Sequence, residues 1–298
     1  MKKWNLQKEN YLLITPSKIR LYNEDFKIYN CYNFPYWELE ELPTLVKRRK
    51  KGVEVIIDTI SSFDIETTTY KDGEKDKAFM YLWGFCINGL IVVGRLWSEF
   101  IYFLKKVQVT LNLDEHKNLI TFIHNASFEF QFVYQFLERE FDGFRFFATS
   151  KRKIIYFQVN GFIFKCSYKL TNMSLDKAVK KEKGTKYHKM VGDLDYSKFR
   201  TPYTPLTYIE WGYFIGDLLS LYDLIKCKLE NENRTLFTLP LTSTGYIREY
   251  LRSKTREDKK YYWFFHKFGM TEHFYQMCKD ELKGGDTHAN RFYQGKIL

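Results

Sequence analysis

The chain has 298 residues, of which 45% are hydrophobic and 28% charged, a composition that indicates a globular protein with a sizeable core and excludes a disordered one. The net charge is +11, and 19% of the residues are aromatic. A basic, aromatic-rich chain suits a polyanion whose bases can stack on rings, so nucleic acid is the first partner to consider. An AT-rich genome produces the same bias in composition.

The five cysteines are scattered and form no CxxC pair, which argues against a disulfide framework or a zinc site and favours a reducing compartment. No apolar run approaches the roughly 18 residues that cross a bilayer. The N-terminus, MKKWNLQKEN, lacks the apolar core of a signal peptide. We therefore expect a cytoplasmic protein with no membrane partner.

Residues 1–50 alternate short apolar and polar pieces, and we interpret them as an N-terminal extension. The basic run VKRRKKG at its end is either a solvated face or a contact for phosphates. Residues 53–70 and 77–97 predict strands, and the second range predicts a β-hairpin that turns at Asn88–Gly89.

The following elements are predicted from apolar spacing: a helix at 98–109, a strand running into a loop at 118–126, a helix at 127–141, two or three strands within 144–170, a short helix at 173–181, a basic loop at 181–203 and a long helix from the start signal Thr204–Pro205 to residue 231. Strands followed by alternating helices and strands predict an α/β domain at residues 51–230. The more polar residues 231–298 form a second, smaller segment.

Asp64 and Glu66 lie two apart in a predicted strand, so they share one face while Ile65 points to the other. Two like charges that close repel each other unless a cation lies between them. A metal site is one interpretation of this pair, and a solvated strand face is the other.

Two further groups of residues could complete such a site. Asn125 and Glu129 fall at a strand end and on the first turn of the next helix, where an Asn is otherwise a cap or turn residue. Tyr213 and Asp217 are four apart on the long helix and share a face, unless the Tyr is simply a core residue beside a surface Asp. Phosphodiester hydrolysis by two divalent ions about 3.5–4 Å apart needs several carboxylates from separate segments, because Mg²⁺ and Mn²⁺ prefer oxygen ligands.

Three stretches, DIETTT, HNASFEF and YFIGD, resemble the three exonuclease motifs of family B DNA polymerases of the protein-primed phage type, in the same order. MSLDKAV resembles the Ser/Thr-Leu motif of that family for single-stranded DNA, and GDLDYSK resembles the segment before its third motif. LKGGDTHANR, at 282–291, resembles the Gly-Gly segment that shortly precedes the first polymerase motif, so the resemblance covers residues 60–298.

The resemblance implies an RNase H-like (DnaQ-type) α/β exonuclease fold, with a mixed β-sheet flanked by helices, and 3′→5′ proofreading with two Mg²⁺ or Mn²⁺ ions. It implies that Asp64, Glu66 and Asp217 are metal ligands, that Glu129 holds the second ion directly or through water, and that Tyr213 orients the nucleophile. The residues implied to contact the 3′ end of single-stranded DNA are Thr67, His124, Asn125, Phe128, Ser174, Leu175, Lys189 and Tyr196. For His124, a buried histidine at a strand end is the alternative.

The chain departs from the family pattern at two site positions. The second motif normally ends in Asp, whereas this chain has Glu129, for which we expect an altered rate rather than a lost activity. Val191 stands where the family has a catalytic Lys, and Lys189, two residues earlier, is the candidate substitute.

The polymerase carboxylates of the family would lie beyond Leu298, so Gly284, Gly285 and Arg291 would belong to the approach to a missing palm. We expect either the N-terminal piece of a split or truncated polymerase or an exonuclease working alone, with no DNA synthesis by this chain. In the first case, a second chain carrying the palm and a terminal priming protein are candidate partners, and the C-terminal segment should expose apolar surface.

Three other functions remain open at this point. The chain could be an RNase H-like nuclease of another polarity or substrate, which would use the same carboxylates. It could be a module that only binds single-stranded DNA, or a structural subunit that completes a polymerase supplied by another chain.

Overall fold

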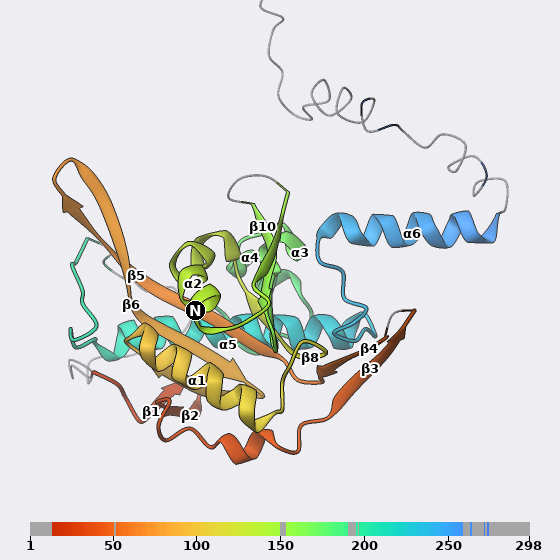
Figure 1. The fold of residues 1–298 in the computed structure, drawn as a ribbon. Helices are drawn as coiled ribbons and strands as arrows, with labels where there is room; N and C mark the ends of the chain where they lie inside the picture. Colours follow the sequence, from red (N-terminus) through yellow and green to blue (C-terminus); the bar gives the residue numbers. More distant parts are fainter. Residues whose placement is uncertain are drawn as a thin grey trace, which may run out of the picture. The chain divides into compact units, whose positions relative to one another are not determined.

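The computed structural model describes residues 14–50, 52–149, 153–189, 195, 197–258, 263, 271 and 273, and the chain divides into two compact units, Met1–Gly245 and Tyr246–Leu298. The first unit contains an 11-stranded mixed sheet in its described residues (Figure 1). The strands are β1 (Lys18–Leu21), β2 (Glu24–Tyr29), β3 (Thr44–Arg49), β4 (Gly52–Ile57), β5 (Ser61–Asp72), β6 (Lys75–Ile87), β7 (Leu90–Gly94), β8 (Lys117–Ile123), β9 (Arg145–Ala148), β10 (Ile154–Val159) and β11 (Phe162–Cys166).

The strands are ordered β1-β2-β7-β6-β5-β8-β11-β10-β9, and β4 joins β3 to β8. Strand β8 runs parallel to β5, β11 and β4, whereas β5, β6 and β7 form an antiparallel meander. The helical elements are η1 (Tyr36–Leu39), α1 (Trp97–Thr110), α2 (Ala126–Glu140), α3 (Ser167–Thr171), α4 (Leu175–Lys181), α5 (Tyr208–Asn231) and α6 (Ser243–Glu257).

Helices cover both faces of the sheet. Helices α1 and α2 share one hydrophobic core with Phe63 and Ile65 of β5. The apolar face of α5 shares a second core with Leu82 of β6 and with β1 and β2. Figure 1 shows α1 in front of β5 and β6 and α5 behind them. Because Phe63 and Ile65 face α1 and α2, the alternating residues Asp64 and Glu66 face the opposite way, toward α5.

The N-terminal extension, residues 1–50, is part of this sheet as far as it is described. Strand β2 pairs in parallel with β7 through Ile28 and Ile91, and β3 forms a hairpin with β4. Apart from Lys51, which lies outside the described residues, the basic run spans the end of β3, Lys50 and the start of β4, and Arg49 forms an ion pair with Glu54. The predicted boundary at residue 50 therefore falls inside a hairpin, because cross-strand hydrogen bonds continue the sheet across it.

The structure corrects the predicted start of the long helix. The helix begins at Tyr208, and its cap is Thr207, whose side chain accepts the N–H of Glu210 while Glu210 accepts the N–H of Thr207. This reciprocal capping box satisfies the N–H groups of Thr207 and Glu210, which have no acceptor within the helix. Thr204 instead closes a preceding turn, where its hydroxyl accepts the N–H of Thr201.

The observed elements also differ from the predicted ones after β5 and after β11. Strands β5 and β6 continue beyond the predicted ranges to a turn at Gly73–Glu74, at the opposite end of β6 from the hairpin turn correctly placed at Asn88–Gly89. The segment after β11 forms the short helix α3 rather than more strand.

The second segment is described only in part. Leu236 and Leu239 are buried in the first unit, past the predicted boundary at residue 230. Helix α6 buries none of its side chains, and Ile247 and Tyr250 are about 60% exposed. Gly284, Gly285 and Arg291 lie outside the described residues. In the described part of the chain, no helix is long and apolar enough to cross a membrane.

Candidate active site

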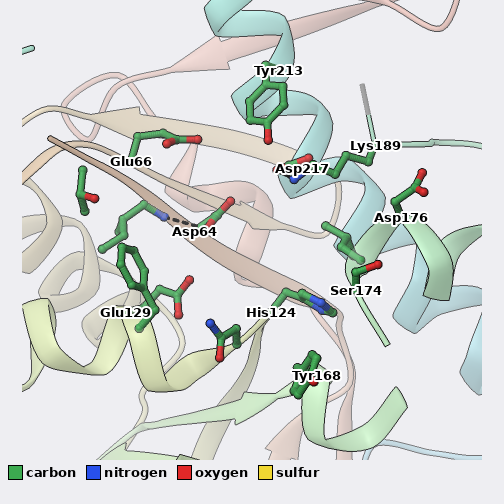
Figure 2. A pocket seen from close by; sticks show the side chains of 15 residues that line it. Asp64, Glu66, His124, Glu129, Tyr168, Ser174, Asp176, Lys189, Tyr213 and Asp217 are labelled. Carbon is green, nitrogen blue, oxygen red and sulfur yellow. Dashed lines mark hydrogen bonds and ion pairs between the residues drawn. The ribbon is translucent and has the colours of Figure 1, made fainter. Parts of the chain in front are cut away.

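One cavity of about 890 Å³ lies where β5, the end of β8, α2, α4 and α5 converge (Figure 2). It is lined by every predicted site residue except Tyr196, which lies outside the described residues: Asp64, Glu66, Thr67, His124, Asn125, Phe128, Glu129, Ser174, Leu175, Lys189, Tyr213 and Asp217. The structure thus brings together residues from segments as distant in the sequence as Asp64 and Asp217.

Strand β5 supplies the first two carboxylates. Asp64 pairs across the sheet with Gly84, and the register between β5 and β6 shifts directly after Glu66. A bulge of this kind bends a strand and redirects its side chains, and it occurs often beside active sites. The Asp64 Oδ1 atom accepts a hydrogen bond of 2.9 Å from the N–H of Ile65, which holds the carboxylate against its own strand.

Helix α5 reaches these strands because position 84 is a glycine. A Cβ atom on Gly84 would lie 2.4 Å from Leu218 Cδ1 and 2.6 Å from Phe214 Cε1. The hydroxyl of Ser62 donates a 2.9 Å hydrogen bond to the carbonyl of Leu218, which holds the helix to β5. Asp217, the residue before Leu218, is therefore brought over the face of the sheet that carries Asp64.

Helix α2 supplies the fourth carboxylate. The helix follows β8 after a single turn in which Asn125 adopts φ +70°, a left-handed conformation that Asn tolerates better than most residues. Glu129 lies on the first helical turn and is only 3% exposed. Its Oε2 atom has no hydrogen-bond partner among the described residues.

Burial disfavours negative charge on all four carboxyl groups, and repulsion by neighbouring carboxylates adds to it for Asp64, Glu66 and Glu129. Burial, and next the charge of Asp217, raise the pKa of Asp64 to about 7, against the hydrogen bond from Ile65. Burial, and next the charge of Asp64, raise the pKa of Glu66 and of Glu129 well above the usual range. Burial also raises the pKa of Asp217, although Lys189 opposes the shift. A bound cation would relieve this repulsion.

The donor set fits hard divalent cations. Among the residues that the structure describes, no three His, Cys, Asp or Glu side chains are gathered closely enough to hold an ion as they stand. However, Glu129 Oε2 and Asp217 Oδ1 are buried without a hydrogen-bond partner in this part of the chain. The four carboxylates offer the oxygen ligands that Mg²⁺ and Mn²⁺ prefer. Binding of ions would therefore require the side chains to move toward one another.

Lys189 is a cation that lines this cavity. Its Nζ atom lies 2.8 Å from Asp217 Oδ2 and 4.9 Å from the centre of the Tyr213 ring, and Figure 2 shows it directed at Asp217. The nearby Asp217 charge raises the pKa of Lys189 despite burial, so the amine stays protonated. Val191, the position that corresponds to the lysine of the family, lies outside the described residues.

The remaining residues form the walls of the cavity. Phe128 is 40% exposed, which leaves its ring accessible. The Nδ1 atom of His124 lies 2.9 Å from the Ser167 hydroxyl, and burial lowers the pKa of His124 to about 4, so the ring is neutral near pH 7. Ser174 occupies the N-cap position of α4, without a capping hydrogen bond from its side chain among the described residues, and Leu175 is the first residue of the helix.

Tyr168 and Asp176 line the cavity but were not predicted. Tyr168 packs edge-on against His124, with 5.9 Å between the ring centres. It lies in α3, where we expected strand, so the sequence pattern offered no signal for it. Asp176 lies inside the MSLDKAV motif, two residues after Ser174, and that spacing could have indicated it.

No protein-family profile matches the chain, and no curated protein is significantly similar to it. Among solved structures, it is similar to Phi29 DNA polymerase complexed with primer-template DNA in a post-translocation binary complex, at 18% identity and a TM-score of 0.56, covering 78% of this chain and 41% of that one. It is also similar to the ternary complex of the same polymerase with incoming nucleotide substrates, at 18% identity and a TM-score of 0.54, covering 79% and 41%.

The match spans about two fifths of the length of those polymerase chains. It extends over most of this chain, whose described residues form a large mixed sheet with helices on both faces. The predicted RNase H-like α/β fold is therefore confirmed, and the chain has the fold of a part of Phi29 DNA polymerase.

Proposed function

We propose that this chain is a 3′→5′ exonuclease that hydrolyses the 3′ end of single-stranded DNA with two divalent metal ions, as the proofreading part of a DNA-directed DNA polymerase. One observation carries the proposal: carboxylates from β5, α2 and α5 line a single cavity together with Tyr213 and Lys189. The basic net charge of +11 and the fold shared with a polymerase agree with a DNA substrate.

Asp64, Glu66, Glu129 and Asp217 would hold the metal ions. When bound, two such ions generate the nucleophile from water at neutral pH and stabilise the charge on the leaving oxygen. Glu129 Oε2 and Asp217 Oδ1 have no hydrogen-bond partner among the residues that the structure describes, which supports this assignment because buried polar atoms without partners are rare in folded proteins. The longer side chain of Glu129 replaces the Asp of the family motif.

Other side chains of the cavity would handle the substrate. Tyr213 lies one helical turn before Asp217, so its hydroxyl can orient the attacking water. Lys189 adds a positive charge beside the same carboxylate and can stabilise the phosphate as its charge develops. Phe128 presents an accessible ring on which the terminal base can stack.

The proposal is tested with a 5′-labelled single-stranded DNA oligonucleotide in Mg²⁺ or Mn²⁺. We expect a ladder that shortens from the 3′ end, is abolished by EDTA and falls at least about 100-fold in Asp64→Ala/Glu66→Ala. The matched control is Glu115→Ala/Asp142→Ala, which removes two carboxylates from a separate hollow of about 370 Å³ and should leave the rate unchanged.

The contrary outcomes distinguish the alternatives. Shortening from the 5′ end, or cleavage of RNA alone, would show a nuclease of another polarity or substrate. Salt-sensitive DNA binding without hydrolysis by the wild type would show a module that only holds the strand, since binding to phosphates weakens as salt rises.

A further inference from the structure

The β1–β2 hairpin belongs to the N-terminal extension, for which the sequence indicates no function. Its apolar side packs on α5: Ile19, Leu21 and Ile28 share a buried core with Trp211. The hairpin also contacts the first turn of the helix, because the Tyr208 hydroxyl donates a hydrogen bond of 3.0 Å to the Arg20 carbonyl and accepts one from the Arg20 N–H. The hairpin is thus fixed on the helix that carries Tyr213 and Asp217.

The polar side of the same hairpin contacts the segment that leads to Lys189. The Tyr22 hydroxyl donates a hydrogen bond to the carbonyl of His188. Glu24 accepts a 3.1 Å hydrogen bond from the Tyr187 hydroxyl and forms an ion pair with Lys186. The rings of Tyr22 and Tyr187 lie 5.1 Å apart. Each of the three residues before Lys189 is therefore held by a side chain of the hairpin.

Helix α5 holds this segment from a second side. Asp223 is 6% exposed, and its Oδ2 atom accepts the N–H groups of Lys186 and Tyr187, at 2.5 and 3.0 Å. Lys189 lies two residues after Tyr187 and places its Nζ atom 2.8 Å from Asp217 Oδ2. The aspartate that fixes the backbone and the aspartate that receives the amine thus lie on the same helix.

The turn of the hairpin shows that Tyr22 is held in an unfavourable conformation. Tyr22 and Asn23 form a two-residue turn with φ +52° and +66°, a geometry for which Asn and Gly are the usual residues. A bulky aromatic residue with positive φ is an outlier that surrounding contacts must stabilise. Burial raises the pKa of Tyr22 to about 12, so its hydroxyl remains a donor to His188.

We propose that the β1–β2 hairpin is a positioning element, in which Tyr22 and Glu24 hold residues 186–188. This lets the side chain of Lys189 reach the carboxylate cavity, although Lys189 lies two residues before Val191, the position of the lysine in the resembling family. The catalytic consequence of this proposal rests on the function proposed above. The contacts themselves are independent of that function. Tyr22 and Glu24 act through Lys189 and do not touch the reacting atoms.

Two mild substitutions test the hairpin without unfolding it. Tyr22→Phe keeps the ring and removes only the donor to His188, and Glu24→Gln removes the ion pair with Lys186. The matched control is the neighbouring Asp25→Asn, which breaks an exposed ion pair with Lys18 within the hairpin. We expect both test variants, but not the control, to speed amide hydrogen exchange in residues 186–189 and acetylation of Lys189 about threefold to tenfold.

Steady-state hydrolysis of single-stranded DNA gives the catalytic readout. In Tyr22→Phe, kcat should fall about threefold to tenfold, with KM changed less than about twofold. In a Lys189→Ala background, Tyr22→Phe should have no further effect on kcat, because the residue through which it acts is gone. An equal loss of kcat in both backgrounds would overturn the positioning role.

Amide hydrogen exchange and acetylation of Lys189 test the positioning role even if the wild type does not hydrolyse DNA. An inactive wild type would contradict the proposed exonuclease, while faster exchange in the two test variants would still show that the hairpin holds Lys189 in the cavity. Unchanged exchange and acetylation in Tyr22→Phe and Glu24→Gln would overturn the inference whatever the activity.

Discussion

Asp64 shows at the scale of a single residue how burial sets the chemistry of the cavity. Its carboxylate accepts one backbone hydrogen bond, from Ile65, and lies within the field of Lys189, and both favour the charged form. Burial and the Asp217 charge outweigh them and raise the pKa to about 7. Near neutral pH, a proton would therefore compete for this group with the metal ions of the proposed site.

This pKa predicts how stability depends on pH. Between the unfolded value near 3.8 and the folded value of about 7, the folded chain binds more protons than the unfolded chain. The free energy of unfolding contributed by this group is therefore fully present below the unfolded pKa and is lost as pH rises to about 7. We expect the Tm in EDTA to fall between pH 5 and 7.5 by about 2–4 °C for each kcal/mol lost, measured by differential scanning fluorimetry.

Asp64→Asn is the control for this prediction, because its side chain can still accept the Ile65 N–H but carries no charge. Its Tm in EDTA should depend less on pH and exceed that of the wild type at pH 7.5. Addition of Mg²⁺ at pH 7.5 should raise the Tm of the wild type more than that of the variant. A pH slope as steep in Asp64→Asn as in the wild type would contradict the assignment of the effect to this carboxyl group.

At the scale of elements, the site depends on the contact between α5 and the β5–β6 pair. Gly84 permits that contact, because any side chain there would occupy the space of Phe214 and Leu218. The Ser62 hydrogen bond to Leu218 and the buried core around Trp211 hold the helix in place. Residues outside the lining of the cavity thus determine where Asp217 lies.

Gly84→Ala should displace α5 from the strands. Overpacking of this kind costs about 1–3 kcal/mol of the free energy of unfolding. We expect kcat for single-stranded DNA to fall at least about tenfold at a temperature where the variant is folded, because misplacement by about 1 Å can reduce catalysis strongly. Denaturant unfolding and single-turnover hydrolysis measure the two effects.

Gly94→Ala is the matched control for Gly84→Ala. A Cβ atom there would lie 2.5 Å from the Trp83 ring, which belongs to the core shared with α1 and α2. This variant should lose comparable stability but retain most of its kcat while folded. If both variants lost activity equally, general destabilisation rather than the position of α5 would explain the result.

At the scale of the whole molecule, the first compact unit ends at Gly245 rather than at residue 230. Leu236 and Leu239 are 1% and 6% exposed. The carbonyl of Leu236 also accepts a 3.4 Å hydrogen bond from Lys165 of β11. The segment after α5 therefore contributes to the core of the first unit.

Two truncations test this boundary. A chain of residues 1–245 should retain the Tm and the hydrolysis of single-stranded DNA shown by the full chain. A chain of residues 1–230 should be less stable, because each buried leucine that it lacks contributes about 1.5–3 kcal/mol. Equal stability of the two truncated chains in denaturant unfolding would show that residues 231–245 are dispensable.

Much of the fold could be predicted because local patterns depend on neighbouring residues. The hairpin turn at Asn88–Gly89, helices α1, α2 and α4, and the placement of Asp64 and Glu66 on one strand face all follow from apolar spacing with the period of a strand or of a helix. The predicted start of α5 at Thr204–Pro205 is wrong, because two Thr-containing turns follow each other in this segment. Only the reciprocal hydrogen bonds of Thr207 and Glu210 distinguish the helix cap from the preceding turn. Helix α3, Ser167–Thr171, was missed because it is too short to show a period.

The sequence by itself determined which residue types could form a site: paired carboxylates on a strand, a Glu on a first helical turn, and a Tyr and an Asp on one helical face. Only the tertiary structure decided that Lys189 lies beside Asp217, that Gly84 admits α5, and that a hairpin from the N-terminal extension holds the segment before the lysine. The physical reason is the distance along the chain over which each kind of interaction acts. Backbone periodicity acts between near neighbours in the chain, whereas burial, close approach and contacts between distant segments arise only when the whole sheet and its helices have packed.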